Sequence, residues 1–131
     1  MAHKTAITGE VSELTVDRIL LANGWQVSKP VVAEAYDRVV IDPANERRLK
    51  AQIKTMRVRE DRDGALVIPA TKGNGSPYTA EDCDLMIGVL GETIYVTETR
   101  GILEYWSDET TASQRWVSME MPRPAGEMLV H

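Results

Sequence analysis

The sequence contains no phenylalanine, one cysteine and two histidines, and no apolar run reaches the length of a membrane span. Without phenylalanine, the core of this 131-residue chain must come from Val, Ile, Leu, Met, Tyr and Trp. The lone Cys83 cannot form an intrachain disulfide, which fits a reducing compartment. His3 and His131 stand near the two ends, and no Cys/His spacing suits zinc. With no signal-peptide pattern at the N-terminus, we expect a soluble cytoplasmic protein that does not bind membranes.

The charge of the chain gives no general sign of nucleic-acid binding, because the formal net charge is -5. Basic residues are nevertheless concentrated between residues 47 and 62, where seven oppose two acids, a local balance of +5. Such a segment can attract a polyanion whatever the total charge, although a solvated, charged strand edge explains it equally well. The basic residues that we consider for DNA contact are Arg48, Lys50, Arg57, Arg59 and, from a later loop, Lys72.

The spacing of apolar residues predicts a helix from about Glu10 to Asn23, after a short lead of residues 1–9 and before a stop at Gly24. Glu13 would then lie in the first turn, where the helix dipole favours a carboxylate. Residues 25–32 are expected to be extended, residues 72–77 to form a flexible loop and residues 79–82 a capped helical turn. Strands are predicted at residues 36–42, 48–58, 65–69, 84–90 and 93–97.

This order of elements predicts a single domain over residues 1–120, of α/β or α+β class, with a mixed central sheet. Residues 121–131 are expected to form a flexible tail. The segment after Gly101 has a weaker pattern, and its Tyr105, Trp106 and Trp116 could pack on the sheet or on another subunit. Cys83 lies among acidic residues, which raise the pKa of a thiol, so we expect a poor nucleophile.

Two of the predicted strands carry a combination of polar groups. Side chains alternate along a strand, so Gln52 and Lys54 point the same way, while Ile53 points to the opposite face. If the two strands pair, Asp37 at the start of the first can lie close to both. Each residue alone has an ordinary structural explanation, but an acid, an amide oxygen and an ammonium together can hold a hard cation beside a polarised water.

The ordered motifs of the chain resemble those of the PD-(D/E)XK nuclease superfamily, in particular the branch with the cyanobacterial group I intron homing endonuclease and related phage proteins. The resemblance runs from about Gly9 to Thr97. It is carried by Ser12-Glu13-Leu14, Gly24-Trp25-Gln26-Val27, Tyr36-Asp37, Gln52-Ile53-Lys54-Thr55, Gly64-Ala65-Leu66-Val67-Ile68-Pro69 and Asp84-Leu85.

The resemblance implies a restriction-endonuclease-like α/β core with a mixed central sheet flanked by helices, and a Mg2+-dependent DNA endonuclease, with Mn2+ as a substitute. Glu13 matches the helix acid, Asp37 the metal-bridging aspartate and Lys54 the lysine of the family. Gln52 replaces the usual acid, as in the homing branch, and the Ile53 carbonyl would be a further ligand. An amide oxygen brings no charge, so we expect one strongly held ion rather than two.

The products implied by the resemblance are a 5′-phosphate and a 3′-hydroxyl on double-stranded or branched DNA. The enzyme would be of homing type or phage-encoded, and would act as a homodimer or a dimer of dimers inside a bacterial cell. Two alternatives remain open. The chain could be a Holliday junction resolvase of the same fold, or a decayed nuclease that serves as a binding or structural module.

Overall fold

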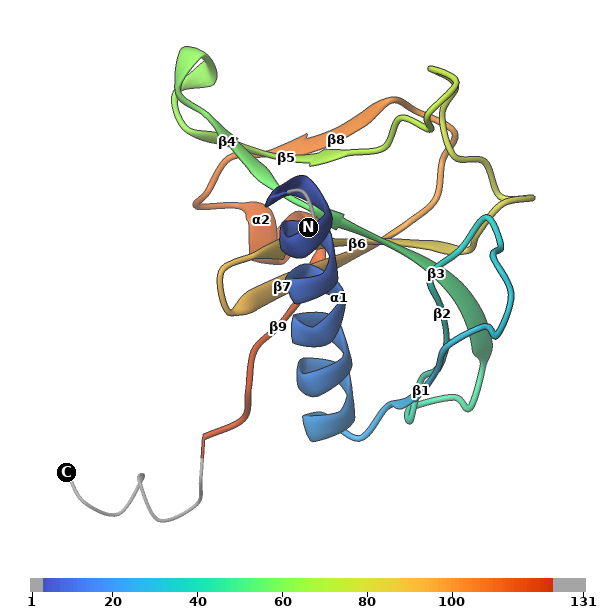
Figure 1. Ribbon diagram of the computed structural model, residues 1–131. Coiled ribbons are helices and arrows are strands. Elements are labelled where there is room, and N and C mark those ends of the chain that lie inside the picture. Colours follow the sequence, from blue (N-terminus) through green and yellow to red (C-terminus); the bar gives the residue numbers. More distant parts are fainter. Residues whose placement is uncertain (1–3, 124–131) are drawn as a thin grey trace, which may run out of the picture.

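The structure, a computed structural model, describes residues 4–123, which form two sheets, one long helix and one short helix (Figure 1). One sheet has six strands in the order β1-β2-β3-β6-β7-β9, and the other has three in the order β4-β5-β8. The elements are α1 (Lys4–Ala22), β1 (Gln26–Ser28), β2 (Arg38–Ile41), β3 (Arg48–Thr55), β4 (Arg57–Arg59), the 3-10 turn η1 (Glu60–Arg62), β5 (Ala65–Pro69), β6 (Leu85–Leu90), β7 (Thr93–Glu98), β8 (Glu104–Ser107), α2 (Ala112–Arg115) and β9 (Val117–Met119).

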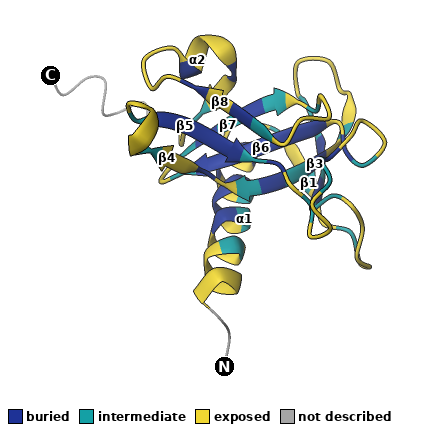
Figure 2. Cartoon of the chain, turned by 90° about the horizontal axis from the view of Figure 1, so that it is seen from above, coloured by how far each residue is buried: buried dark blue, intermediate teal, exposed yellow. Residues whose placement is uncertain are grey.

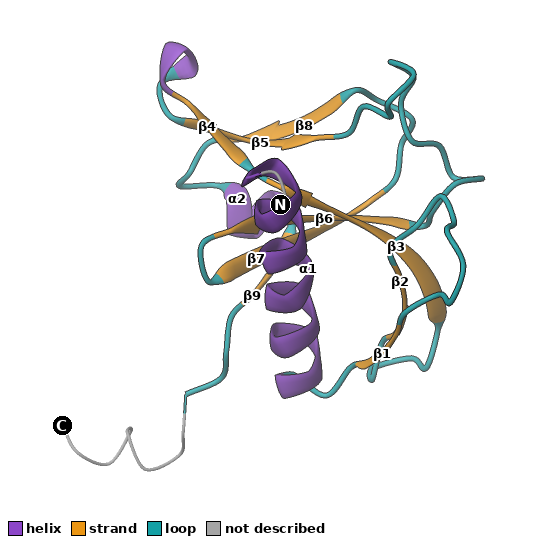
Figure 3. Ribbon diagram, in the orientation of Figure 1, coloured by secondary structure: helices purple, strands orange, loops and turns teal. Residues whose placement is uncertain are grey.

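The two faces of the six-stranded sheet pack against different layers, as the separation of helix and strands in Figure 3 shows. On one face, α1 buries Val16, Ile19 and Leu20 against strand residues that include Ile53 and Ile87. On the other face, the three-stranded sheet and α2 enclose a second core that contains Ile68 and Met86. Because side chains alternate along a strand, the neighbours Met86 and Ile87 of β6 serve opposite cores. The central strand β6 is consequently buried on both faces (Figure 2).

The two sheets approach each other closely at Gly88 in β6. A Cβ atom there would lie 2.6 Å from Cγ1 of Ile68 and 2.7 Å from Cγ of Met56, far inside normal contact distance. This position pairs with Lys54 in the parallel register of β3 and β6. The close spacing of the two sheets beside Lys54 therefore requires a residue without a side chain at position 88.

The predicted fold class is confirmed by this arrangement. The sheet is mixed, because β3 pairs with β6 in parallel and with β2 antiparallel. The strands predicted over residues 65–69, 84–90 and 93–97 correspond to β5, β6 and β7. Gly24 ends α1 with a positive φ of 87°, a conformation that favours glycine after a helix. No helix among residues 4–123 combines the length and apolar character needed to cross a membrane.

Two local predictions are wrong. The helix begins at Lys4 rather than near Glu10, so Glu13 lies in the middle of α1, away from the N-terminal end of the dipole. The strand predicted over residues 48–58 is interrupted at Met56, whose side chain is buried between the sheets. The chain thereby leaves the six-stranded sheet after β3 and enters the other sheet as β4.

The segment after Gly101 supplies parts of both sheets. Tyr105 in β8 and Trp116 after α2 are buried in the core between the sheets, whereas Trp106 is half exposed. The packing of Trp116 within its own chain argues against a place for it at a subunit interface. Most of the predicted tail, residues 124–131, lies outside the described residues, as do His3 and His131.

Candidate active site

Asp37 lies just before β2 and is held to β3 by two hydrogen bonds. Its N–H donates to the carbonyl of Ala51 at 2.9 Å, and its Oδ2 accepts from the N–H of Ile53 at 3.0 Å. These contacts fix the carboxylate beside Gln52, which lies between the two bonded residues. Among residues 4–123, no group donates a hydrogen bond to the second oxygen, Oδ1.

Gln52 and Lys54 point to the same side of β3, as their alternation predicts, and both are half-buried. The Nζ atom of Lys54 lies 5.2 Å from the centroid of the Tyr78 ring. Within the described part of the chain, neither side chain has a hydrogen-bond partner or an ion-pair partner. The amide and the ammonium therefore retain their full capacity to bind an external group.

Glu13 reaches the same region from α1 through a buried arginine. The Oε1 atom of Glu13 accepts from Nη1 of Arg38 at 2.8 Å, and Asp17, one turn further along α1, accepts from Arg38 Nε at 2.8 Å and Nη2 at 3.0 Å. Arg38 Nη1 also donates to the carbonyl of Asp37 at 2.8 Å. The guanidinium, only 2% exposed, thus connects the acid on α1 to Asp37, the acid just before β2.

All four predicted catalytic side chains line one cleft of about 560 Å³ between α1 and the C-terminal end of β3. The cleft also includes Arg57, at the start of β4, and the predicted ligand Ile53. Its remaining lining residues are Lys4, Thr5, Thr8, Gly9, Ser12, Thr55, Met56 and Pro69. Ser12 and Thr55, two of these lining residues, are joined by a hydrogen bond of 2.7 Å between their hydroxyls.

The negative charge of Asp37 acts on Glu13, the other acid of the cleft. Burial, and next the negative charge of Asp37, raise the pKa of Glu13 above its usual value, against the lowering effect of its hydrogen bond to Arg38. A bound cation would offset the unfavourable effect of the Asp37 charge on the charged form of Glu13. The same negative charge contributes, after burial, to a raised pKa of Tyr78, which places the tyrosine in the field of this site.

The donor set of the cleft is compatible with a hard divalent cation. Carboxylate oxygens from Glu13 and Asp37, the amide oxygen of Gln52 and the carbonyl of Ile53 are all of the oxygen type that Mg2+ prefers. Within residues 4–123, no three His, Cys, Asp or Glu side chains gather as a metal-binding group. The cleft offers two carboxylates only, so the neutral oxygens of β3 would have to complete the coordination.

The basic residues proposed for DNA contact fall into two groups, one exposed and one already paired with acidic side chains. Arg48, Lys50 and Arg57 are exposed, and Lys50 lies over the ring of Tyr36 at 5.4 Å. Arg59 is instead paired with Asp61 at 2.8 Å, and Lys72 with Asp82 at 2.7 Å. Both pairings reduce the positive charge that these two residues can offer to a phosphate backbone.

Arg38, Asp17 and Tyr78 also belong to this region and were not predicted from the sequence. Two signals were available. Arg38 occupies an inward-facing position two residues before the core residue Val40, and a charge placed there needs partners. Asp17 follows Glu13 by four residues, which puts both acids on one side of a helix. No local pattern marks Tyr78, which arrives from a loop.

Cys83 is fully buried in the core between the sheets. Burial is the main cause that raises the pKa of its thiol, and the neighbouring acids add to it after the opposing effect of a hydrogen bond to Thr99. The low nucleophilicity predicted for Cys83 is therefore due mainly to burial of the thiol, and the neighbouring acids are a lesser cause.

A search of protein families and a search of curated proteins found no match to this chain. Among solved structures, the fold is similar to that of a bacterial homing endonuclease, I-Ssp6803I, with a TM-score of 0.61 at 22% sequence identity. The similarity covers 83% of this chain and 78% of the endonuclease. The chain therefore shares its mixed α/β fold with a bacterial homing endonuclease.

Proposed function

We propose that the protein is a divalent-metal-dependent DNA endonuclease with its catalytic centre in the cleft between α1 and β3. One observation carries the proposal. Two acids, an amide and a lysine from separate segments converge in this cleft with unsatisfied polar atoms, on a fold shared with a homing endonuclease. Each of these residues alone would be ordinary. Together they are unusual, because a fold gains little stability from bringing together polar groups that do not hydrogen-bond to one another.

Glu13, Asp37 and Gln52, with the Ile53 carbonyl, would hold the ion. A bound Mg2+ would lower the pKa of water and polarise a phosphate oxygen. Only Oε1 of Glu13 is bonded to Arg38, so the second oxygen remains the available donor. Asp37 similarly offers the oxygen that the Ile53 N–H does not use.

The reaction would be hydrolysis of a phosphodiester at the phosphorus–O3′ bond. Water adds to phosphorus, the bond to O3′ breaks, and the departing oxygen takes up a proton, which leaves a 5′-phosphate and a 3′-hydroxyl. Lys54 would orient the attacking water and offset the negative charge that develops on the phosphate oxygens. Its ammonium suits this role because no carboxylate among residues 4–123 forms an ion pair with it.

The test is cleavage of supercoiled plasmid and of long natural DNA in Mg2+, Mn2+ or EDTA. Asp37→Asn retains an oxygen that can accept the Ile53 N–H and removes only the charge, so we expect a folded protein with cleavage reduced at least ~100-fold. Lys54→Ala should lose activity similarly. Matched controls are Asp108→Asn and Lys29→Ala, which change exposed residues outside the cleft. Cleavage that survives in both cleft variants would contradict the assignment.

Two alternatives are resolved when four-way junctions and a DNA-binding measurement are added to this experiment. A preference for four-way junctions over linear duplexes would make the protein a resolvase of this fold. Tight DNA binding without cleavage in any metal would indicate a decayed nuclease that acts as a binding module. The neutral Gln52 and the engagement of Glu13 by Arg38 favour this second alternative over an unrelated function.

We also propose that two copies act together, because residues 4–123 of one chain place this donor set in a single cleft and a double-strand break needs two cuts. Light scattering of the protein with and without a duplex would measure the assembly. A monomer that cuts both strands at one site would contradict this proposal.

A further inference from the structure

Lys54 has a long, flexible side chain, yet its proposed role needs a defined position. A carboxylate could hold the lysine, but it would also neutralise the charge and occupy the N–H donors. The contact that the structure gives the Lys54 ammonium is instead the face of an aromatic ring, at 5.2 Å from Nζ to the Tyr78 centroid. A ring attracts the ammonium through its quadrupole and leaves the N–H groups free for a phosphate or a water.

Tyr78 is itself held firmly. Its side chain is buried to 9% exposure in the core between the sheets. Its N–H donates to the carbonyl of Ala70 at 3.3 Å, and the pairing of Thr71 with Pro77 closes the intervening loop. The ring thus presents a fixed face toward the end of β3.

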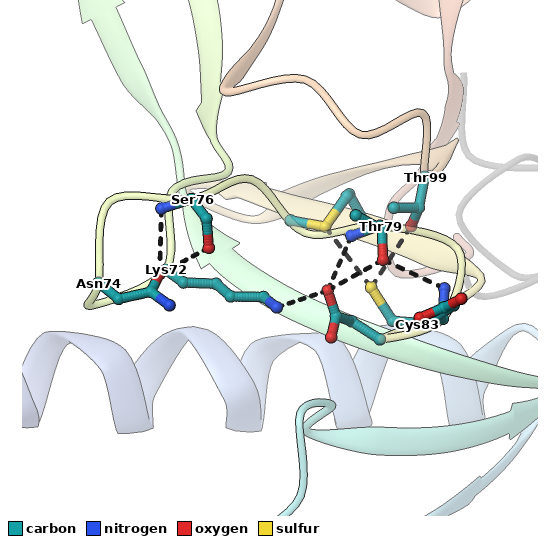
Figure 4. A network of polar contacts seen from close by, with 9 residues as sticks. Lys72, Asn74, Ser76, Thr79, Cys83 and Thr99 are labelled. Carbon is teal, nitrogen blue, oxygen red and sulfur yellow. Dashed lines mark hydrogen bonds and ion pairs between the residues drawn. The ribbon is translucent and has the colours of Figure 1, made fainter.

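A second lysine contacts the same ring, but its charge is already compensated. Lys72 Nζ lies 5.8 Å from the Tyr78 centroid and 2.7 Å from Oδ2 of Asp82. Asp82 is in turn fixed by the N–H of Thr79 at 2.8 Å. Figure 4 shows Lys72 extended from its loop toward the Thr79 turn. Of the two cations at the ring, Lys54 alone has no acidic partner among the described residues.

Hydrogen bonds connect the loop of residues 72–77, which the sequence predicts to be flexible, within itself, and connect the segment after it to β3. Asn74 Oδ1 accepts from Ser76 N at 3.0 Å and from Ser76 Oγ at 2.6 Å (Figure 4). The segment after this loop is joined to β3, since Asp84 N donates to Lys50 O and Lys50 N donates to Asp84 Oδ2, both at 2.8 Å. The loop and β3 therefore hold the ring and the lysine in one frame.

We propose that Tyr78 is a positioning residue that holds the Lys54 ammonium at the cleft through the face of its ring. This inference rests on the proposed nuclease function. Its chemistry predicts that an aromatic ring is needed and that the phenolic hydroxyl is not. Tyr78→Phe should therefore act like the wild-type protein, whereas Tyr78→Leu should leave Lys54 without a defined position.

The first experiment does not use activity. The NMR signals of the Lys54 ε-methylene, identified by their loss in Lys54→Arg, should be shifted upfield by the ring in wild-type protein and in Tyr78→Phe. They should move to ordinary lysine values in Tyr78→Leu. Lysine signals that are the same in all three proteins would overturn the proposal.

The second experiment measures single-turnover cleavage at saturating and subsaturating DNA. Tyr78→Leu should lower the cleavage rate about tenfold with little change in DNA affinity, within the range that a cation–π contact covers. Tyr105→Leu is the matched control, because Tyr105 is buried in the same core but contacts Arg100 and not Lys54. An equal loss of rate in this control would assign the effect to general destabilisation and overturn the proposal.

The two hypotheses fail in different ways. If Tyr78→Leu cuts DNA as well as the wild-type protein does, the positioning role is refuted and the nuclease function stands. A wild-type protein that cuts no substrate, but shows the upfield Lys54 signals, refutes the nuclease function. In that case the contact between ring and ammonium stands, without a role in cleavage.

Discussion

Replacing Arg38 by methionine should be among the more damaging single changes in this protein. The guanidinium is 2% exposed and donates hydrogen bonds to Glu13, to Asp17 and to the carbonyl of Asp37. Methionine fills much of the volume but leaves two carboxylates facing each other without a cation. Removing one partner of a buried ion pair costs roughly 3–5 kcal/mol.

The lower end of that range applies to Arg38, because the two carboxylates are not fully buried. The side chains of Glu13 and Asp17 are 23% and 26% exposed, so water can hydrate them partly once Arg38 is gone. We therefore expect a loss of about 3 kcal/mol in the free energy of unfolding. For a chain of this size, that loss corresponds to a melting temperature lower by roughly 9–15 °C.

Urea unfolding followed by circular dichroism measures this effect, with Arg18→Met as the control. Arg18 lies on the same helix and pairs with Glu92, but both side chains are largely exposed, so its replacement should cost under about 1 kcal/mol. If Arg38→Met were no more damaging than the control, the buried arginine would not be what holds α1 to β2. A double variant with Asp17→Asn should recover part of the loss, since it removes one of the two unpaired charges.

Three further predictions concern packing, pH and DNA binding. Gly88→Ala should destabilise the protein by roughly 1–3 kcal/mol, because the new methyl group would overlap Met56, and an unchanged urea midpoint would refute the close sheet contact. The raised pKa of Glu13 means that its charged form weakens the fold, so stability from this group is present below pH 4.5 and is lost as pH rises above that value. In urea unfolding at pH 4.5–8, Glu13→Gln should reduce the loss of unfolding free energy with rising pH, and the variant should also cleave less DNA. If the pH dependence of stability were unaltered in this variant, burial of Glu13 would not be the cause of that loss. Arg57→Ala should weaken DNA binding and lower its salt slope by about one, measured by anisotropy at several salt concentrations, while Arg59→Ala, already paired with an acid, should do less.

The strand residues of the site are predictable from sequence because their arrangement is local. Alternation along residues 48–55 places Gln52 and Lys54 together, and the structure has β3 over these same residues. A turn of a few residues brings Asp37 alongside. In contrast, the pairing of β3 with β6 joins segments some thirty residues apart in parallel, and no short pattern specifies their register.

The start of α1 and the break after β3 could not be predicted from the sequence, because solvent exposure and tertiary packing determine them. Residues 4–9 extend α1 by more than one turn, but none of them is fully buried, so no apolar periodicity marks the true start of the helix. Gly9, inside this turn, further resembles a helix break in sequence. The break at Met56 is equally invisible, because a methionine fits a strand, and only the second core explains why the chain changes sheet there.

The hydrogen bond from the Ile53 N–H to the Asp37 carboxylate couples a backbone nucleus to the charge of the cleft. Its amide resonance should respond when an ion arrives at that carboxylate, even with no DNA present and no bond broken. Ligand occupancy can thus be titrated on a catalytically silent sample, by observing one peak in a nitrogen–proton correlation spectrum.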